Sequence, residues 1–157
     1  MSLQIVLLCV GRLGAAPEAK LALDWASRAT AAGRALGLGP VEIVEVESRK
    51  PGKAAEAEVI LDRIDQGGVL IACDEHGRAL ASRAFADSLA RLRDEGIRRA
   101  TFVIGGADGL DAQVLSQARE RLAFGPQTWP HALVRAMLAE QVYRAATILA
   151  GSPYHRD

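Results

Sequence analysis

Short apolar runs alternate with longer helical segments along this chain, and this alternation constrains its fold more than any other feature. Leu3–Val10, Val69–Cys73 and Ala100–Ile104 are too short for core helices and are typical of strands buried on both faces of a sheet. Val41–Val46 alternates between apolar and polar residues, which predicts a further, partly exposed strand. Strands separated by helices predict an α/β fold with a mostly parallel sheet flanked by helices.

Segments with helical patterns lie between and after these strands. The predicted helices are Pro17–Leu36, Lys53–Gln66, Ser82–Asp94, Asp111–Leu122 and Leu133–Leu149. We expect Ser82 and Asp111 to cap their helices, because side-chain oxygens at that position accept hydrogen bonds from the free amides of the first turn. Residues 1–157 are expected to form a single domain, since this length suits one domain and is too short for two.

Charge and cysteine content exclude several classes of protein. The chain has 19 Lys and Arg and 19 Asp and Glu residues, so its net charge is zero and nucleic-acid binding cannot be argued from bulk charge. Cys9 and Cys73 are too few for a disulfide scaffold, and no Cys/His spacing suits zinc, so we expect no metal. The apolar run Ile5–Val10 is too short to span a membrane and lacks the pattern of a leader. We therefore expect a cytoplasmic protein with no membrane partner.

Two loops follow predicted elements at the edge where parallel sheets bind ligands. Ile104–Gly109 has three glycines in five residues, and glycine lets a ligand approach the backbone closely. The loop is neither a P-loop nor a GxGxxG motif, so a tight turn without a ligand explains it equally well. Phe124–His131 contains two prolines and Trp129, which suits a rigid loop around an adenine-like ring. A crossover loop with Trp129 in the core is the favoured interpretation of this segment taken alone.

Polar residues near the third predicted strand offer little chemistry by themselves. Cys73 lies in an apolar run and suits a small core residue better than a nucleophile. Asp74 is placed where α/β proteins often contact a ligand, although a turn-forming Asp is more common. His76 has no matching cluster of ligands, so a metal role is not expected.

The C-terminal helix and the tail are richer in functional side chains. Glu140 and Arg144 have the spacing of a helical ion pair. Tyr154, His155 and Arg156 supply an aromatic ring, a titratable group and a cation in a row, which suits RNA; a frayed polar end is the equal alternative. The small or adaptable residues of the helix suit close approach by a second copy, and a face buried within one chain explains them equally well: Ala136, Met137, Ala139 and Ala146.

Four segments carry a resemblance that none carries alone: IGGADG at 104–109, TWPHALVR at 128–135, EQVYRA at 140–145 and PYHR at 153–156. Together they resemble the ribosomal large subunit methyltransferase H family of the SPOUT superfamily, over essentially the whole chain. The chain departs from the common family pattern at Ala107, Asp108 and Trp129, where Pro, Glu, and Leu or Phe are usual. These departures affect loop stiffness and pocket shape.

The resemblance implies a fold, a cofactor, a substrate and a partner. It implies a deep C-terminal trefoil knot, which general rules on chain topology would have excluded. It implies S-adenosylmethionine held in the knot, methylation of N3 of a pseudouridine in 23S rRNA of the assembled ribosome, and a homodimer. By matching position, the cofactor contacts would come from Cys73, Gly105, Phe124, Gly125, Pro126, Gln127, Thr128 and Trp129.

Transfer of the methyl group requires that the N3 proton leaves, and the tail suggests how. We hypothesise that His155 or a nearby carboxylate removes the proton, that Tyr154 packs against the base and that Arg156 pairs with phosphate. The alternatives are a related enzyme acting on another RNA, a non-catalytic nucleotide- or ribosome-binding module, and an ordinary α/β nucleotide-binding domain without a knot.

Overall fold

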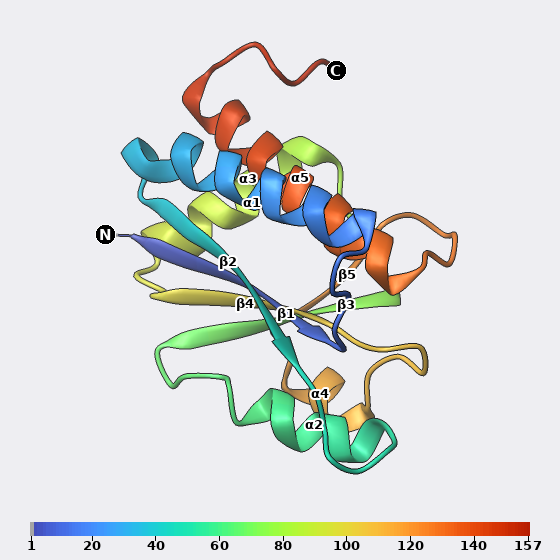
Figure 1. Cartoon of the computed structure of the whole chain (residues 1–157). Helices are drawn as coiled ribbons and strands as arrows, with labels where there is room; N and C mark the ends of the chain where they lie inside the picture. Colours follow the sequence, from blue (N-terminus) through green and yellow to red (C-terminus); the bar gives the residue numbers. More distant parts are fainter. Residues whose placement is uncertain (1) are drawn as a thin grey trace.

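Five parallel strands form the central sheet of the computed structural model, which describes residues 2–157 (Figure 1). Their order across the sheet is β2-β1-β4-β3-β5, and every neighbouring pair is parallel. The strands are β1 Leu3–Val10, β2 Leu38–Val46, β3 Gly68–Ala79, β4 Arg99–Ile104 and β5 Glu120–Ala123. The predicted mostly parallel α/β sheet is therefore confirmed.

Helices cover both faces of this sheet (Figure 1). They are α1 Pro17–Gly33, α2 Lys53–Leu61, α3 Ser82–Asp94, α4 Ala112–Gln117 and α5 His131–Ala150, and a short 3-10 helix spans Arg34–Leu36. On one face α1, α3 and α5 bury a core that includes Phe102, Leu89 and Leu138. On the other face α2 and α4 cover Leu8, Ile60 and Val114. Because β1 and β4 carry apolar side chains toward both layers, these strands lie in the middle of the sheet.

The alanines of α5 meet α1 of the same chain. Ala139 and Ala145 belong to the same core cluster as Ala26 and Ala29 of α1, and all four are buried. Small side chains let the two helices lie close together over the sheet. Ala136, Ala139 and Ala146 are all buried in the single chain, which favours a face buried within it, whereas Met137 lines a cleft against α3.

The predicted helix Asp111–Leu122 is wrong in its second half. Asp111 does cap α4, since its Oδ1 accepts from the Gln113 amide at 2.9 Å. The chain turns extended at Ala118, and residues 120–123 form a fifth strand beside β3. Leu122 and Ala123 are buried there. Two neighbouring apolar residues are compatible with a helix or a strand, and the pairing with β3 selects the strand.

Several other boundaries differ from the prediction. Ser82 is the first residue of α3 and not its cap, because its hydroxyl donates to Oε1 of Gln141 at 2.9 Å while Ala81 takes the cap position. The helix predicted over 53–66 ends at Leu61, where short turns begin. β3 continues past Cys73 to Ala79 and shifts its register against β5 on the way.

No helix of residues 2–157 is long and apolar enough to cross a membrane.

Candidate functional site

A cleft of about 270 Å³ opens beside the middle of β3 and the carboxyl ends of β4 and β5. Its walls are residues 73–75 of β3, the glycine loop that follows β4, the loop that follows β5 and the first turn of α5. Six of the eight residues predicted to hold a cofactor line it: Cys73, Gly105, Phe124, Gln127, Thr128 and Trp129. Gly125 lines a neighbouring cleft against α3 and α5, and Pro126 lines neither. The topology thus brings together residues that are up to 61 positions apart (134 − 73).

The glycine loop is folded back tightly on itself. Its two ends pair through an isolated bridge between Gly106 and Gly109, and the Gly109 amide donates to the Gly106 carbonyl at 3.1 Å. A Cβ at Gly105 would lie 2.8 Å from the Gly109 carbonyl oxygen, closer than real side chains approach. Glycine is therefore required at position 105, and the loop presents backbone groups to the cleft.

Trp129 closes the second loop and does not enter the core. Its indole Nε1 donates to the Phe124 carbonyl at 2.9 Å, and the residue is 39% exposed at the cleft. The favoured interpretation of Trp129 as a core residue is therefore wrong, and the rigid loop is the structure observed. Thr128 donates to Oε2 of Glu75 at 2.8 Å, which ties this loop to β3.

Acidic and apolar groups share the lining of the cleft. Asp74, Glu75 and Asp108 line it, and no Lys or Arg of the described chain does. Leu110, Leu122 and Val134 add apolar surface to the rings of Phe124 and Trp129. A cleft of this composition suits a ligand that carries positive charge and a flat apolar ring.

Cys73 and His76 offer neither a nucleophile nor a metal site. Burial raises the pKa of the Cys73 thiol far above its usual range, so the thiol stays protonated. His76 is exposed and pairs only with Glu75 among residues 2–157. Within that range, no three His, Cys, Asp or Glu side chains are grouped so as to hold a metal ion.

A buried ion pair holds the start of α5 close to the cleft. Arg135 is 2% exposed, and its Nη1 donates to Oε2 of Glu45 on β2 at 2.6 Å. The same oxygen accepts from the Leu13 amide at 3.0 Å, so the loop after β1 is held as well. The hydrogen bond from Arg135 and the one from Leu13 lower the pKa of Glu45 below its ordinary value. Val134, next to this arginine, lines the cleft.

The C-terminal tail is held against α5 and is not a frayed end. The Tyr154 hydroxyl donates to Oε1 of Glu140 at 2.8 Å, and the Arg144 guanidinium lies 4.8 Å from the centre of the Tyr154 ring. Arg144 also donates to Glu140 at 2.7 Å, so the predicted helical ion pair is confirmed. Burial and the hydrogen bond to Glu140 raise the pKa of Tyr154, which remains a neutral phenol.

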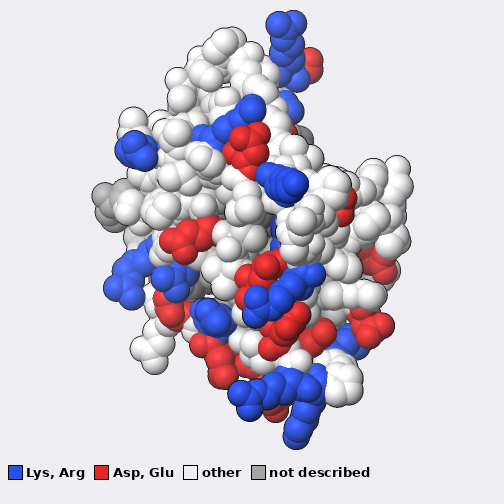
Figure 2. All heavy atoms as spheres, in the orientation of Figure 1, with Lys and Arg blue, Asp and Glu red and all other residues white. Residues whose placement is uncertain are grey.

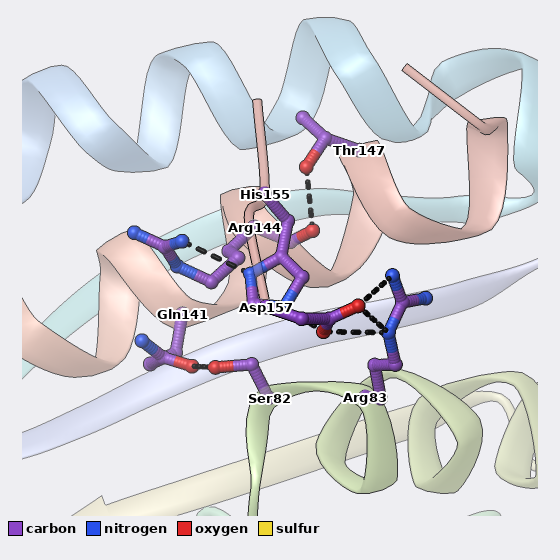
Figure 3. Close-up of polar contacts among 7 residues, drawn as sticks. All are labelled: Ser82, Arg83, Gln141, Arg144, Thr147, His155 and Asp157. Carbon is purple, nitrogen blue, oxygen red and sulfur yellow. Dashed lines mark hydrogen bonds and ion pairs between the residues drawn. The ribbon is translucent and has the colours of Figure 1, made fainter. Parts of the chain in front are cut away.

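His155 lies between two charged partners in the same cluster (Figure 3). Its Nδ1 is 3.1 Å from Nη1 of Arg144, and its Nε2 is 3.1 Å from Oδ1 of Asp157. Asp157 in turn accepts two hydrogen bonds of 2.9 Å from Arg83 of α3. Arg156 is exposed and forms no ion pair within the described residues.

The tail does not reach the cleft of its own chain. His131 and Val134 of α5 line the cleft, whereas the tail contacts Glu140 and Arg144 further along the same helix. The helix rises about 14 Å between His131 and Glu140. The predicted cofactor residues and the predicted catalytic residues therefore lie in two separate groups within one chain.

The sequence did not predict Glu75 at the cleft or Arg83 beside the tail as site residues. Glu75 comes two residues after the end of the predicted strand at Cys73, and that position was a usable signal. Arg83 carried no signal, because it meets Asp157 across 74 positions of sequence.

The sequence of this chain is similar to those of known proteins. Residues 3–155 match the family described as "Predicted SPOUT methyltransferase". The chain is 70% identical over 155 residues to the ribosomal RNA large subunit methyltransferase H of Caulobacter sp. strain K31, covering 99% of this chain and 100% of that protein. It is 54% identical over 155 residues to the protein of the same name from Dinoroseobacter shibae, covering 98% of this chain and 99% of the relative.

A solved structure has a similar fold. The probable methylase family protein of Haemophilus influenzae Rd KW20 superposes with a TM-score of 0.51, over 99% of this chain and 70% of that one. Sequence identity is 14%, so this similarity concerns the fold alone.

Proposed function

This chain belongs to the SPOUT methyltransferase family, and we propose that it methylates N3 of a pseudouridine in the 23S rRNA of the assembled ribosome, with S-adenosylmethionine as the methyl donor. The observation that carries the proposal is the 70% identity over the full length of a ribosomal RNA large subunit methyltransferase H. Action on ribosomes would place the protein in the cytoplasm. The domain is proposed to span residues 1–157, with the trefoil knot in its C-terminal part.

The chemistry of the cleft fits this methyl donor. S-adenosylmethionine carries a sulfonium and an ammonium cation beside an adenine ring, and it supplies an electrophilic methyl group when bound. Asp74, Glu75 and Asp108 provide the complementary charge, and apolar side chains provide walls for the ring. The donor would be held by residues that line the cleft, with Gly125 and Pro126 contributing as parts of the same loop: Cys73, Gly105, Phe124, Gln127, Thr128 and Trp129. Positioning of this kind lowers the barrier without a metal or a covalent intermediate.

The tail supplies the groups that would act on the acceptor base. Asp157 is 3.1 Å from His155, and Glu140 is joined to the same ring through Arg144. One of these carboxylates, or His155 once its Nδ1 releases Arg144, would take the N3 proton. Tyr154 would pack against the base, and the exposed Arg156 would pair with phosphate. The cluster of hydrogen bonds described above supports the roles of Tyr154 and His155 because it holds their side chains in one geometry.

A homodimer would unite the two groups. Since the tail lies apart from the cleft of its own chain, we propose that the tail of one copy faces the cleft of the other. Large apolar side chains exposed on α1 and at the start of α5 support a second copy as partner: Leu21, Leu23 and Leu133. A second copy packed against these helices would remove the leucine side chains from water.

A complementation experiment tests the shared site. Gly105→Ala disrupts the cleft, and the triple variant Y154A/H155A/R156A removes the tail side chains. Each variant alone is expected to be inactive on ribosomes, and co-expressed heterodimers are expected to recover methyl transfer. Heterodimers that form without recovering activity would contradict a site built from two chains.

Binding and transfer are measured separately to test the proposed reaction. Calorimetry is expected to detect adenosylmethionine binding to the wild type and to the triple tail variant, while transfer to ribosomes is lost in the variant. Full activity of that variant would end the assignment of the tail. Mass mapping of the methylated nucleoside separates N3 of pseudouridine from another RNA position, and binding without transfer by the wild type would indicate a non-catalytic module.

A further inference from the structure

We infer that Arg83, in the first turn of α3, is a positioning residue that holds Asp157 and through it sets the orientation of the His155 ring. The inference rests on the proposed function, in which His155 belongs to the reacting site. Arg83 lies outside every motif that identifies the family in this chain, and it joins the tail to α3 (Figure 3).

The geometry of the contact between Arg83 and Asp157 is that of a fork. Nε of Arg83 is 2.9 Å from Oδ1 of Asp157, and Nη2 is 2.9 Å from Oδ2. Both side chains are largely exposed, so an ordinary ion pair here would contribute little to stability. A bidentate pair, however, fixes the plane of the carboxylate, which a single contact does not do.

The Asp157 carboxylate accepts the proton that the neutral His155 ring carries, and Arg144 determines which nitrogen carries it. A guanidinium has only donors, so Nδ1 of His155 must accept from Arg144. The proton of the neutral ring is then on Nε2, which donates to Oδ1 of Asp157. Arg83 of α3 keeps Oδ1 of Asp157 in place because its Nε binds the same oxygen atom as His155.

The other charged groups around the ring belong to the same arrangement. Arg144 is held by Glu140, and Asp87 of α3 contributes further negative charge near Arg83. Arg83 and His155 together lower the pKa of Asp157, so the acceptor remains ionised at neutral pH. Without Arg83, Asp157 has one partner in place of two, and the chain end loses its attachment to α3.

A test that does not depend on activity uses the ring proton of His155. In wild-type protein, nitrogen-15 NMR is expected to show an Nε2–H signal protected by its hydrogen bond, assigned by its absence in His155→Gln. Arg83→Ala and Asp157→Ala should both lose this protection. Arg83→Lys should retain part of it, because lysine keeps the charge without the fork. Arg91→Ala is the matched control, since Arg91 is an exposed arginine of the same helix with no ion pair in the described chain.

Kinetics on ribosomes test whether the orientation matters to the reaction. Arg83→Ala is expected to lower kcat about fivefold while KM for S-adenosylmethionine changes by less than about twofold, because the donor cleft is built from other residues. The double variant R83A/D157A should be no slower than Asp157→Ala, since both side chains act through one contact. Arg91→Ala should behave as the wild type.

The outcomes separate the inference from the proposed function. An Nε2–H signal that persists in Arg83→Ala overturns the positioning role, and so does a lost signal with an unchanged kcat. Equal losses in Arg91→Ala would also overturn it, because the effect would then belong to the helix in general. Wild-type protein without activity on ribosomes overturns the proposed function, and the NMR comparison then still decides whether Arg83 orients His155.

Discussion

Arg135 shows how much one buried charge can organise at the scale of the residue. It joins α5 to β2 through Glu45, and its Nε has no hydrogen-bond partner in the described part of the chain. A buried cation with an unsatisfied donor is costly unless its remaining contacts are good. The ion pair is therefore a vulnerable point in the attachment of α5 to β2.

Replacing Glu45 tests this vulnerability. Glu45→Gln should lower the free energy of unfolding at pH 7 by about 2 kcal/mol, less than for a fully buried pair because Glu45 is partly exposed. The pKa of Glu45 is lowered in the folded state, so the contribution is complete above its ordinary value of 4.5 and is lost as pH falls through the folded-state value. Urea unfolding over a pH series should show the two proteins converging in acid.

Glu47→Gln provides the control for this comparison. Glu47 pairs with Arg12 on the surface, and both side chains are mostly exposed. Its substitution should change stability by less than about 0.5 kcal/mol. A constant difference between wild type and Glu45→Gln down to pH 3 would contradict the assignment.

The two cysteines are predicted to be unreactive in the native protein. Burial raises the pKa of Cys9 to about 11, and that of Cys73 is raised as well. At pH 8 the Cys9 thiolate fraction is then about a thousandth. A colorimetric thiol reagent should label neither residue in native protein at that pH and both after denaturation. Rapid labelling of the native protein would show that the thiols are accessible and ionised.

At the scale of the element, the conformation of the loop between β4 and α4 requires glycine at position 105 but not at position 106. A Cβ at Gly105 meets the Gly109 backbone at 2.8 Å, whereas a Cβ at Gly106 has its nearest contact at 3.7 Å. Gly105→Ala should therefore cost about 2 kcal/mol of stability through overpacking. Gly106→Ala, one position away, should cost less than about 0.5 kcal/mol. Thermal unfolding of the two variants makes the comparison, and equal melting temperatures would contradict it.

The sequence pattern of β5 was too short to predict a strand. Residues 120–123 have no alternation long enough to distinguish a strand from the end of a helix. Their conformation is set by pairing with β3, and Cys73 is the partner of Leu122. β5 then directs the chain into the loop that carries Trp129, so a short element without a clear pattern builds one wall of the cleft.

At the scale of the whole molecule, charge is balanced. Positive and negative side chains are interspersed over the face drawn in Figure 2, in keeping with 19 residues of each sign. Binding to free RNA relies on neutralising phosphates, and a protein without excess positive charge has little of this affinity. Recognition of the RNA should then depend on the surface of the assembled ribosome.

The protein is predicted to methylate assembled ribosomes in preference to naked 23S rRNA. The kcat/KM for methyl transfer should be at least about tenfold higher with ribosomes than with naked 23S rRNA. The comparison is made at one salt concentration, with product measured from a radiolabelled methyl donor. Equal values for the two substrates would contradict it.

The sequence alone determined the α/β class, most strands, the Asp111 cap and the segments that identify the family. These features depend on local patterns: the period of apolar residues, the conformational freedom of glycine and the hydrogen bonding of a capping side chain. Only the tertiary structure decided that residues 120–123 form a strand, that Ser82 binds Gln141, that Trp129 faces the cleft and that the tail lies away from it. Each of these depends on a partner distant in sequence, such as Arg83 for Asp157, and local patterns carry no information about which distant group will be nearby.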